Sequence, residues 1–454
     1  NAKLRDELLI AYRAASDLTG KASMFVIALV AARRLSPVEF GLFSLSTTTG
    51  WMMAIAADFG IQFHLARAVA RAPEQSSSIL SRWLRVRLWT TGLAIFVVAS
   101  GLAFARAGSA FGVPMLIFTV TYAGSGLIEF LHYFYRGVSR SDLESTLVLW
   151  QRIATLAAGL MALWWWPDIR ILGLALLVPV VATLFTSLRI AQRLCESLTT
   201  GPATAPPYRP AIREALRDVF PIGAGILLSA LYFRIDVFLV QAWQGSVAVA
   251  RYNAVFRLVE GLRLFPAAAL AVSMPALCRA RDLGPLVRVA TKVTTFGVIA
   301  TLTLSAGARW MVPLLYGEPY ASAAQAFRIL MFSFPLLSLN YALTHQLLGW
   351  DGQWPYAAVC GLALVVNVAL NARLIPAYSI EGAAWATLGT EVFLSVGCIA
   401  ALRIKALRVR SKKSGDGGAG APSAVCRDGV AAADPRGLGV GPQAVRMQTP
   451  NVSI

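Results

Sequence analysis

The sequence predicts an all-α polytopic membrane protein with about 12 transmembrane helices in two six-helix lobes. The first observation is a series of twelve mostly apolar runs between residues 12 and 402, each of roughly 20 residues, which is the length needed to cross a hydrocarbon core. The second is composition, since 57% of the residues are hydrophobic and only 14% are charged. The third is a basic charge that alternates between successive loops. Soluble folds do not bury so many helices that are apolar all round.

The predicted spans fall into two groups of six on either side of a proline-rich segment, 201–210. Proline lacks the amide donor, so this segment ends the preceding helix. The spans before it are 12–32, 40–64, 83–104, 113–134, 147–166 and 169–190. Those after it are 220–243, 246–274, 293–315, 324–348, 356–375 and 382–402. The predicted domains are therefore an N-terminal lobe (1–200), a cytoplasmic linker (201–213), a C-terminal lobe (214–405) and a basic, disordered cytoplasmic tail (406–454).

The basic residues indicate the orientation of the chain. If the N-terminus is cytoplasmic, the inner loops hold 25 Lys and Arg residues, Arg87 among them, and the outer loops hold five. The five are Arg33, Arg34, Arg106, Arg170 and Arg373. Cytoplasmic loops are enriched in basic residues, so both termini are expected inside. A net charge of +18 divided in this way is a topology signal, and it does not form the single patch that nucleic acid would require.

The two halves resemble each other at an offset of 209 positions. Phe40–Phe43 opens span two and Val249–Tyr252 opens span eight, while Gly173 and Gly382 open spans six and twelve. With six spans per half, the repeats keep the same topology, so a pseudo-twofold axis along the membrane normal is expected to relate them. This is the layout of an alternating-access transporter, with substrate between the lobes.

Ionisable residues inside the spans are the candidates for function, because such side chains usually face a cavity or a partner. Arg257 and Glu260, and Glu260 and Arg263, are each three residues apart and can pair along one helix face. One interpretation is a salt-bridge ladder that only neutralises charge. The other is a positively charged cavity in which the arginines bind a diphosphate through bidentate hydrogen bonds. The predicted substrate-binding residues are Lys21, Arg234, Asp236, Arg257, Glu260 and Arg263.

Two carboxylates of the first lobe, Asp58 and Glu129, are candidates for binding a coupling proton or sodium ion. The alternative for Asp58 is an interfacial carboxylate at a helix end. No metal-ligand spacing, nucleotide-binding loop or catalytic motif is found in the sequence, which predicts no metal, no cofactor and no enzyme activity.

Four groups of motifs resemble the polysaccharide exporter (Wzx-type flippase) family over residues 10–405. The first lobe contributes Arg34–Phe43, Asp58–Gly60 and Ala66–Arg71. The second contributes Tyr232–Leu239 with Tyr252 and Arg257–Glu260, then Leu315–Tyr320 with Ala326–Leu330, and finally Asn367–Asn371, Leu374–Pro376 and Gly382–Thr387. This family belongs to the multidrug/oligosaccharidyl-lipid/polysaccharide exporter superfamily, in which spans one, two, seven and eight line the central cavity.

The resemblance implies a flippase that moves polyisoprenoid-diphosphate-linked oligosaccharide from the cytoplasmic to the periplasmic leaflet for surface polysaccharide synthesis. It implies a bacterial inner membrane location, with the lipid bilayer, a polymerase and other assembly proteins as partners. A drug/cation antiporter of the same superfamily is the first alternative, although its cavity should be acidic. A membrane polymerase or ligase is the second, but the predicted outer loops are too short to build its active site.

Overall fold

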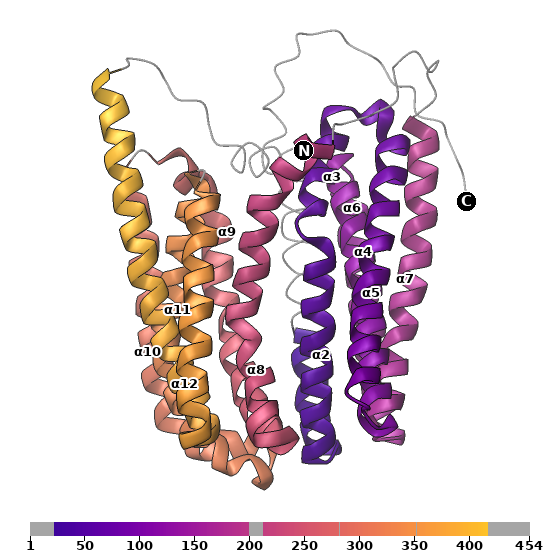
Figure 1. Cartoon of the computed structure of the whole chain (residues 1–454), viewed down its shortest axis with the longest axis vertical. Helices are drawn as coiled ribbons and strands as arrows, with labels where there is room; N and C mark the ends of the chain where they lie inside the picture. Colours follow the sequence, from indigo (N-terminus) through magenta and orange to yellow (C-terminus); the bar gives the residue numbers. More distant parts are fainter. Residues whose placement is uncertain (1–21, 199–211, 281, 351, 416–454) are drawn as a thin grey trace, which may run out of the picture.

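The twelve predicted spans are confirmed as helices in the computed structural model, which describes residues 22–198, 212–280, 282–350 and 352–415 and so includes the first span only from residue 22. No strand occurs in these ranges. Lys21, residues 201–211 of the predicted linker and the predicted tail beyond residue 415 lie outside the described residues. The helices form two lobes that stand side by side with their long axes parallel (Figure 1).

The first lobe contains six passes, and its second pass is broken into two helices. Residues 22–34 form the first described helix. The remaining elements are α2 (Pro37–Asp58), α3 (Ile61–Arg71), η1 (Pro73–Gln75), α4 (Ser76–Phe104), α5 (Ser109–Gly137), α6 (Ser141–Trp165) and α7 (Ile169–Leu198).

The second lobe repeats this arrangement with longer continuous helices. Its elements are α8 (Ile212–Leu262), α9 (Leu264–Arg279), α10 (Gly284–Tyr316), η2 (Glu318–Ala323), α11 (Ala324–Gly349) and α12 (Gln353–Gly415). Both α8 and α12 cross twice, because each contains one non-helical residue, Gly245 in α8 and Ser379 in α12. α12 continues to Gly415, so the first ten residues of the predicted tail are helical.

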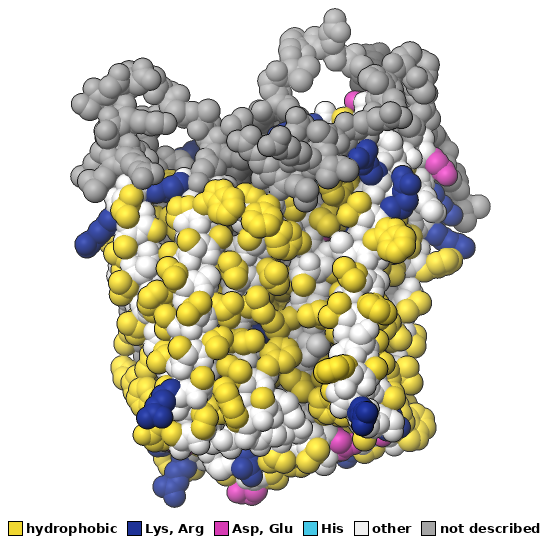
Figure 2. Space-filling view, viewed as in Figure 1, with side chains coloured by type: hydrophobic (Ala, Val, Ile, Leu, Met, Phe, Trp, Pro, Cys, Tyr) yellow, Lys and Arg dark blue, Asp and Glu magenta, His cyan; other side chains and the backbone are white. Residues whose placement is uncertain are grey.

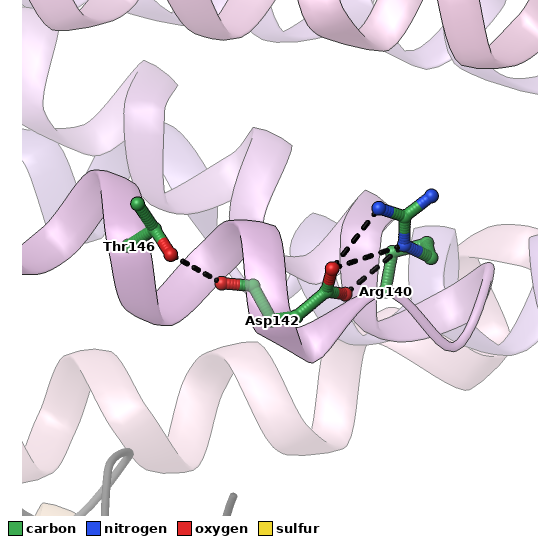
Figure 3. A network of polar contacts seen from close by, with 3 residues as sticks. All are labelled: Arg140, Asp142 and Thr146. Atoms are coloured by element: carbon green, nitrogen blue, oxygen red, sulfur yellow. Dashed lines mark hydrogen bonds and ion pairs between the residues drawn. The ribbon is translucent and has the colours of Figure 1, made fainter. Parts of the chain in front are cut away.

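We call the end of the bundle that carries Arg67, Arg140 and Arg279 the basic end, and the other the opposite end. At the basic end, Arg140 donates from Nε to Asp142 at 3.0 Å, and Thr146 donates to the Asp142 carbonyl at 2.9 Å (Figure 3). Asp142 lies in the first turn of α6, where its negative charge interacts favourably with the helix dipole. Both side chains of this ion pair are exposed, so it marks the start of a helix and contributes little to stability.

The chain departs from helical geometry at defined residues. α2 begins with a capping box in which Ser36 and Glu39 satisfy each other's backbone amides. It ends at Phe59 and Gly60, which both adopt left-handed conformations, with φ of 42° and 82°. Gly245 has φ 75° and ψ −177°, a region that glycine enters without steric cost. The predicted span 40–64 is therefore two helices that meet at Phe59–Gly60.

Apolar side chains cover the outside of the bundle. Among the residues that the structure describes, eight helical segments are long and apolar enough to cross a membrane, and two of them run through the breaks in α8 and α12. Figure 2 shows apolar side chains over most of the height, with Lys and Arg concentrated toward the two ends. Large residues such as Trp89 and Phe104 are exposed, which suits contact with lipid tails. The chain is a multi-pass membrane protein.

The buried cores differ between the two ends. In the half nearer the opposite end, one continuous core joins both lobes and includes Phe43 and Phe118 of the first with Tyr252 and Phe334 of the second. In the basic half each lobe has its own core. The start of α8 is the exception, because Val219 packs in the first-lobe core. The lobes thus pack together at the opposite end and have separate cores toward the basic end.

Candidate functional site

Arg234 lies at the centre of the predicted basic group. It is buried on the first pass of α8, and Nη1 donates to Asn253 Oδ1 at 2.9 Å. Nη2 donates to Glu260 Oε2 at 3.1 Å. Its guanidinium carbon is 4.5 Å from the centre of the Phe256 ring. Asn253, Phe256 and Glu260 all belong to the second pass of α8, so Arg234 joins the two passes of this helical hairpin.

The ladder along one face of α8 is not observed. Glu260 bonds to Arg234, and the residues on either side of it in the proposed ladder, Arg257 and Arg263, form no ion pair with it in the described part of the chain. The Glu260 side chain is 39% exposed, whereas that of Arg234 is 7% exposed. Glu260 therefore neutralises Arg234, the most deeply buried arginine of this group, and lies within electrostatic range of Arg263 without forming an ion pair with it.

Arg257 lies at the contact between the lobes. Its guanidinium carbon is 5.9 Å from the ring of Phe43 on α2. Its Nε is buried without a hydrogen-bond partner among the described residues. Tyr122 of α5 and Tyr316 of α10 both lie within electrostatic range of it. An arginine that is half-buried between two lobes, with an unused donor, is suited to bind an anion.

Arg263 lies at the break between α8 and α9, between two aromatic rings. Its guanidinium carbon is 4.1 Å from the ring of Phe233 and 5.0 Å from that of Tyr341. Nη2 also donates to the Tyr341 hydroxyl at 3.2 Å. This packing fixes the planar group in one orientation and leaves its remaining donors available, since a guanidinium carries five.

Asp236 lies within electrostatic range of Arg234, but its hydrogen bonds are to other residues. It is buried and accepts a hydrogen bond from Tyr252, whose hydroxyl is 3.3 Å from Thr387 Oγ1 on α12. It also accepts from the Val237 amide at 2.8 Å. Asp236 therefore links the two passes of α8 to α12, as a structural polar contact inside the second lobe.

The first lobe brings Asp58 close to an arginine that sequence reasoning placed in a loop. Arg87 of α4 is only 1% exposed, and its Nε is 3.7 Å from Asp58 Oδ1. Its Nη2 donates to the Ala54 carbonyl at 3.2 Å. Asp58 also accepts from the Gly60 amide at 3.1 Å, which stabilises the break between α2 and α3. The position of Arg87 inside predicted span 83–104 was the signal for its burial.

Glu129 is the third charged group of this cluster. It is an exposed side chain on α5, within electrostatic range of Arg136, Arg152 and Arg87. Arg136 is already engaged, because it forms a forked pair with Glu144 of α6. Gly126, one turn before Glu129, leaves room for Arg87, since a Cβ there would lie 2.8 Å from its Nη2. Arg87 therefore lies between the helices that carry the two predicted ion-binding carboxylates.

The fold and this site define a transporter of two lobes with charged residues between and inside them. The family model described as "Polysaccharide biosynthesis protein" matches residues 10–281. The chain belongs to this polysaccharide biosynthesis protein family, a family of transporters and flippases. No curated protein is a significant sequence match to it.

Solved structures share the fold at low sequence identity. The chain is similar to lipid II flippase MurJ in an inward closed conformation, with 10% identity, a TM-score of 0.64, and 93% of this chain and 96% of that chain covered. It is similar to an inward-facing multidrug resistance MATE family transporter of the MOP superfamily, at 15% identity and TM-score 0.64, over 87% and 96% of the two chains. It is also similar to a MOP superfamily transporter from Pyrococcus furiosus described as having a binding pocket of reverse polarity. The sequence identity is 17% and the TM-score 0.64, with 90% of this chain and 97% of that chain covered. The predicted family resemblance and two-lobe architecture are confirmed.

Proposed function

We propose that this protein is a flippase that moves polyisoprenoid-diphosphate-linked oligosaccharides across the bacterial inner membrane for surface polysaccharide synthesis. The basic end faces the cytoplasm in this proposal, with both termini inside. The observation that carries it is the charge between the lobes. Arg257 and Arg263 form no ion pair among the described residues, and Arg257 keeps an unused buried donor.

The separation of the cores supports alternating access. The lobes share one core near the opposite end and have separate cores near the basic end, which suits a state that accepts substrate from the cytoplasmic leaflet. A diphosphate headgroup would meet the arginines between the lobes, where low dielectric strengthens a bidentate pair. The sugar would occupy the space between the lobes, and the isoprenoid chain would stay in the lipid.

Substitution of the two arginines tests this proposal. Arg257→Ala and Arg263→Ala should reduce flipping of a diphosphate-linked substrate in proteoliposomes at least tenfold, since loss of one charged hydrogen bond costs about 1.5–3 kcal/mol. Lysine at either position should restore part of the activity, because it keeps the charge and loses the fork. Full activity of both alanine variants would refute an anion-binding role.

Asp58 and Glu129 are the proposed sites for a coupling proton or sodium ion. Asp58 pairs with Arg87 and Glu129 lies within electrostatic range of it, so binding of a cation would compete with this arginine. The same acidic pair supports the second candidate function, a drug/cation antiporter. Transport of a cationic dye that requires Asp58 and Glu129 and ignores Arg257→Ala would favour the antiporter over the flippase.

A further inference from the structure

Two adjacent arginines, Arg33 and Arg34, lie at the opposite end of the bundle, where the predicted outer loops hold few basic residues. Arg33 and Arg34 are the last two residues of the first described helix, at the end where basic residues are scarce. Both side chains are exposed. The function proposed above uses neither of them, yet both make specific hydrogen bonds.

Arg34 binds the end of a helix in its own lobe. Its Nε donates to the Leu163 carbonyl at 3.1 Å and its Nη2 to the Trp164 carbonyl at 2.7 Å, at the C-terminal end of α6. Its guanidinium carbon is 5.3 Å from the Trp164 ring. The last carbonyls of a helix lack intrahelical donors and carry partial negative charge, so an arginine fork satisfies two of them.

Arg33 makes the same contact across to the other lobe. Its Nε donates to the Leu315 carbonyl at 2.7 Å, and its Nη2 donates to the Leu314 carbonyl. These are among the last carbonyls of α10. The chain thus uses one chemistry twice in adjacent residues, once within a lobe and once between lobes.

The surrounding contacts between the lobes are close and apolar. Phe40 of α2 meets the edge of the Tyr320 ring at a centroid distance of 5.9 Å. Gly41 lies so close to α8 that a Cβ there would be 1.9 Å from the Ser246 carbonyl oxygen. If the lobes part at this end, these contacts and the Arg33 fork must separate together.

We propose that Arg33 is a latch that holds the lobes closed at the opposite end and must be released before the substrate can leave there. This inference rests on the alternating access of the proposed function. The fork is exposed to water, which can replace the lost hydrogen bonds, so the latch is reversible. Because it holds only the closed state, its removal should shift the equilibrium toward the state open at this end.

The test measures opening directly. Ala250 is buried one helical turn after Ser246 on α8, within the core shared by the two lobes. Ala250→Cys is introduced after replacement of the five native cysteines, and purified protein in nanodiscs is treated with a water-soluble maleimide. Arg33→Gln should increase the labelling rate of Cys at position 250 about tenfold, the shift produced by about 1.4 kcal/mol. The labelling rate of Arg33→Lys should fall between those of the parent and Arg33→Gln.

Arg34→Gln is the matched control, because it removes the same kind of fork from the same helix end without uncoupling the lobes. It should leave the labelling rate unchanged. Equal rates for Arg33→Gln and Arg34→Gln, at equal melting temperatures, would refute the latch. The readout needs no substrate, so it is independent of the proposed function. A labelling increase for Arg33→Gln without any flipping by the parent protein would support the latch and refute the flippase. Flipping by the parent protein without a labelling increase would support the flippase and refute the latch.

Discussion

Arg87 reaches Asp58 inside the first lobe, where Nε and Oδ1 are 3.7 Å apart and both side chains are almost fully buried. The two atoms are too far apart for a hydrogen bond, and Nε and Nη1 of Arg87 have no hydrogen-bond partner among the described residues. The pair also lies beside the break between α2 and α3, whose Phe59 carbonyl touches α8 of the other lobe. A charge change here therefore acts next to the contact between lobes.

A double-mutant cycle should reveal this pair. Arg87→Met leaves Asp58 buried and uncompensated, so it should destabilise the protein by about 3–5 kcal/mol. Adding Asp58→Asn should recover part of the loss, because the remaining side chain carries no charge. Thermal unfolding in detergent measures each variant. Strictly additive effects would show that the two residues do not interact.

The two most central arginines should respond differently to alanine. Arg234→Ala removes the partner of Asn253 and Glu260 together, so it should lower protein abundance and melting temperature, with a cost of about 2–4 kcal/mol. Arg257→Ala breaks no hydrogen bond to a described residue, so abundance should stay normal while flipping is lost.

Glu260→Gln is the control for this comparison. The glutamine carbonyl oxygen can still accept from Arg234, so abundance should remain near that of the parent. Immunoblotting of membranes together with a flipping assay separates variants that lose protein abundance from variants that lose only transport. Normal abundance and full activity for Arg234→Ala would contradict its role in holding the α8 hairpin.

The membrane-spanning helices could be predicted because each leaves a local hydropathy signal in the sequence. The side-chain pairings between helices could not, because they join residues that are distant along the chain. Hydropathy placed all twelve spans, since lipid contact imposes an apolar surface on each one. Spacing along the chain suggested that Glu260 pairs with Arg257 or Arg263, yet it accepts a hydrogen bond from Arg234, 26 positions earlier on the antiparallel pass. Such a contact depends on how the α8 hairpin closes, which periodicity does not encode.

Charge near a span end was the second source of error. Arg87 was counted with the loop residues because long basic side chains near span ends usually extend to the interface. Here Gly126 leaves space for the guanidinium between α4 and α5, and Asp58 provides a counter-charge. Neither feature is visible without the packing of the three helices.

Topology reporters test the proposed orientation. Fusions at Ala107 and Ser379 should report periplasm, because the first lies between α4 and α5 at the opposite end and the second at the break in α12. Fusions at Ser77 and Lys412 should report cytoplasm, in agreement with the positive-inside rule. A cytoplasmic signal at Ala107 or Ser379 would invert the proposed direction of transport.

Gly223 should be the most sensitive position at the contact between the lobes near the basic end. A Cβ there would lie 2.2 Å from the Phe59 carbonyl oxygen of the other lobe, and backbone atoms on both sides leave no flexible group to move. Gly223→Ala should therefore cost about 1–3 kcal/mol through overpacking and force α8 away from the α2–α3 break.

Gly92 is the matched control, since a Cβ there has no neighbour within 4 Å. Gly92→Ala should be neutral or stabilise the protein by about 0.5–1 kcal/mol, because alanine loses less backbone entropy than glycine in a helix. Thermal unfolding gives both values, and equal melting temperatures for the two variants would show that the close contact at Gly223 does not hold the lobes together.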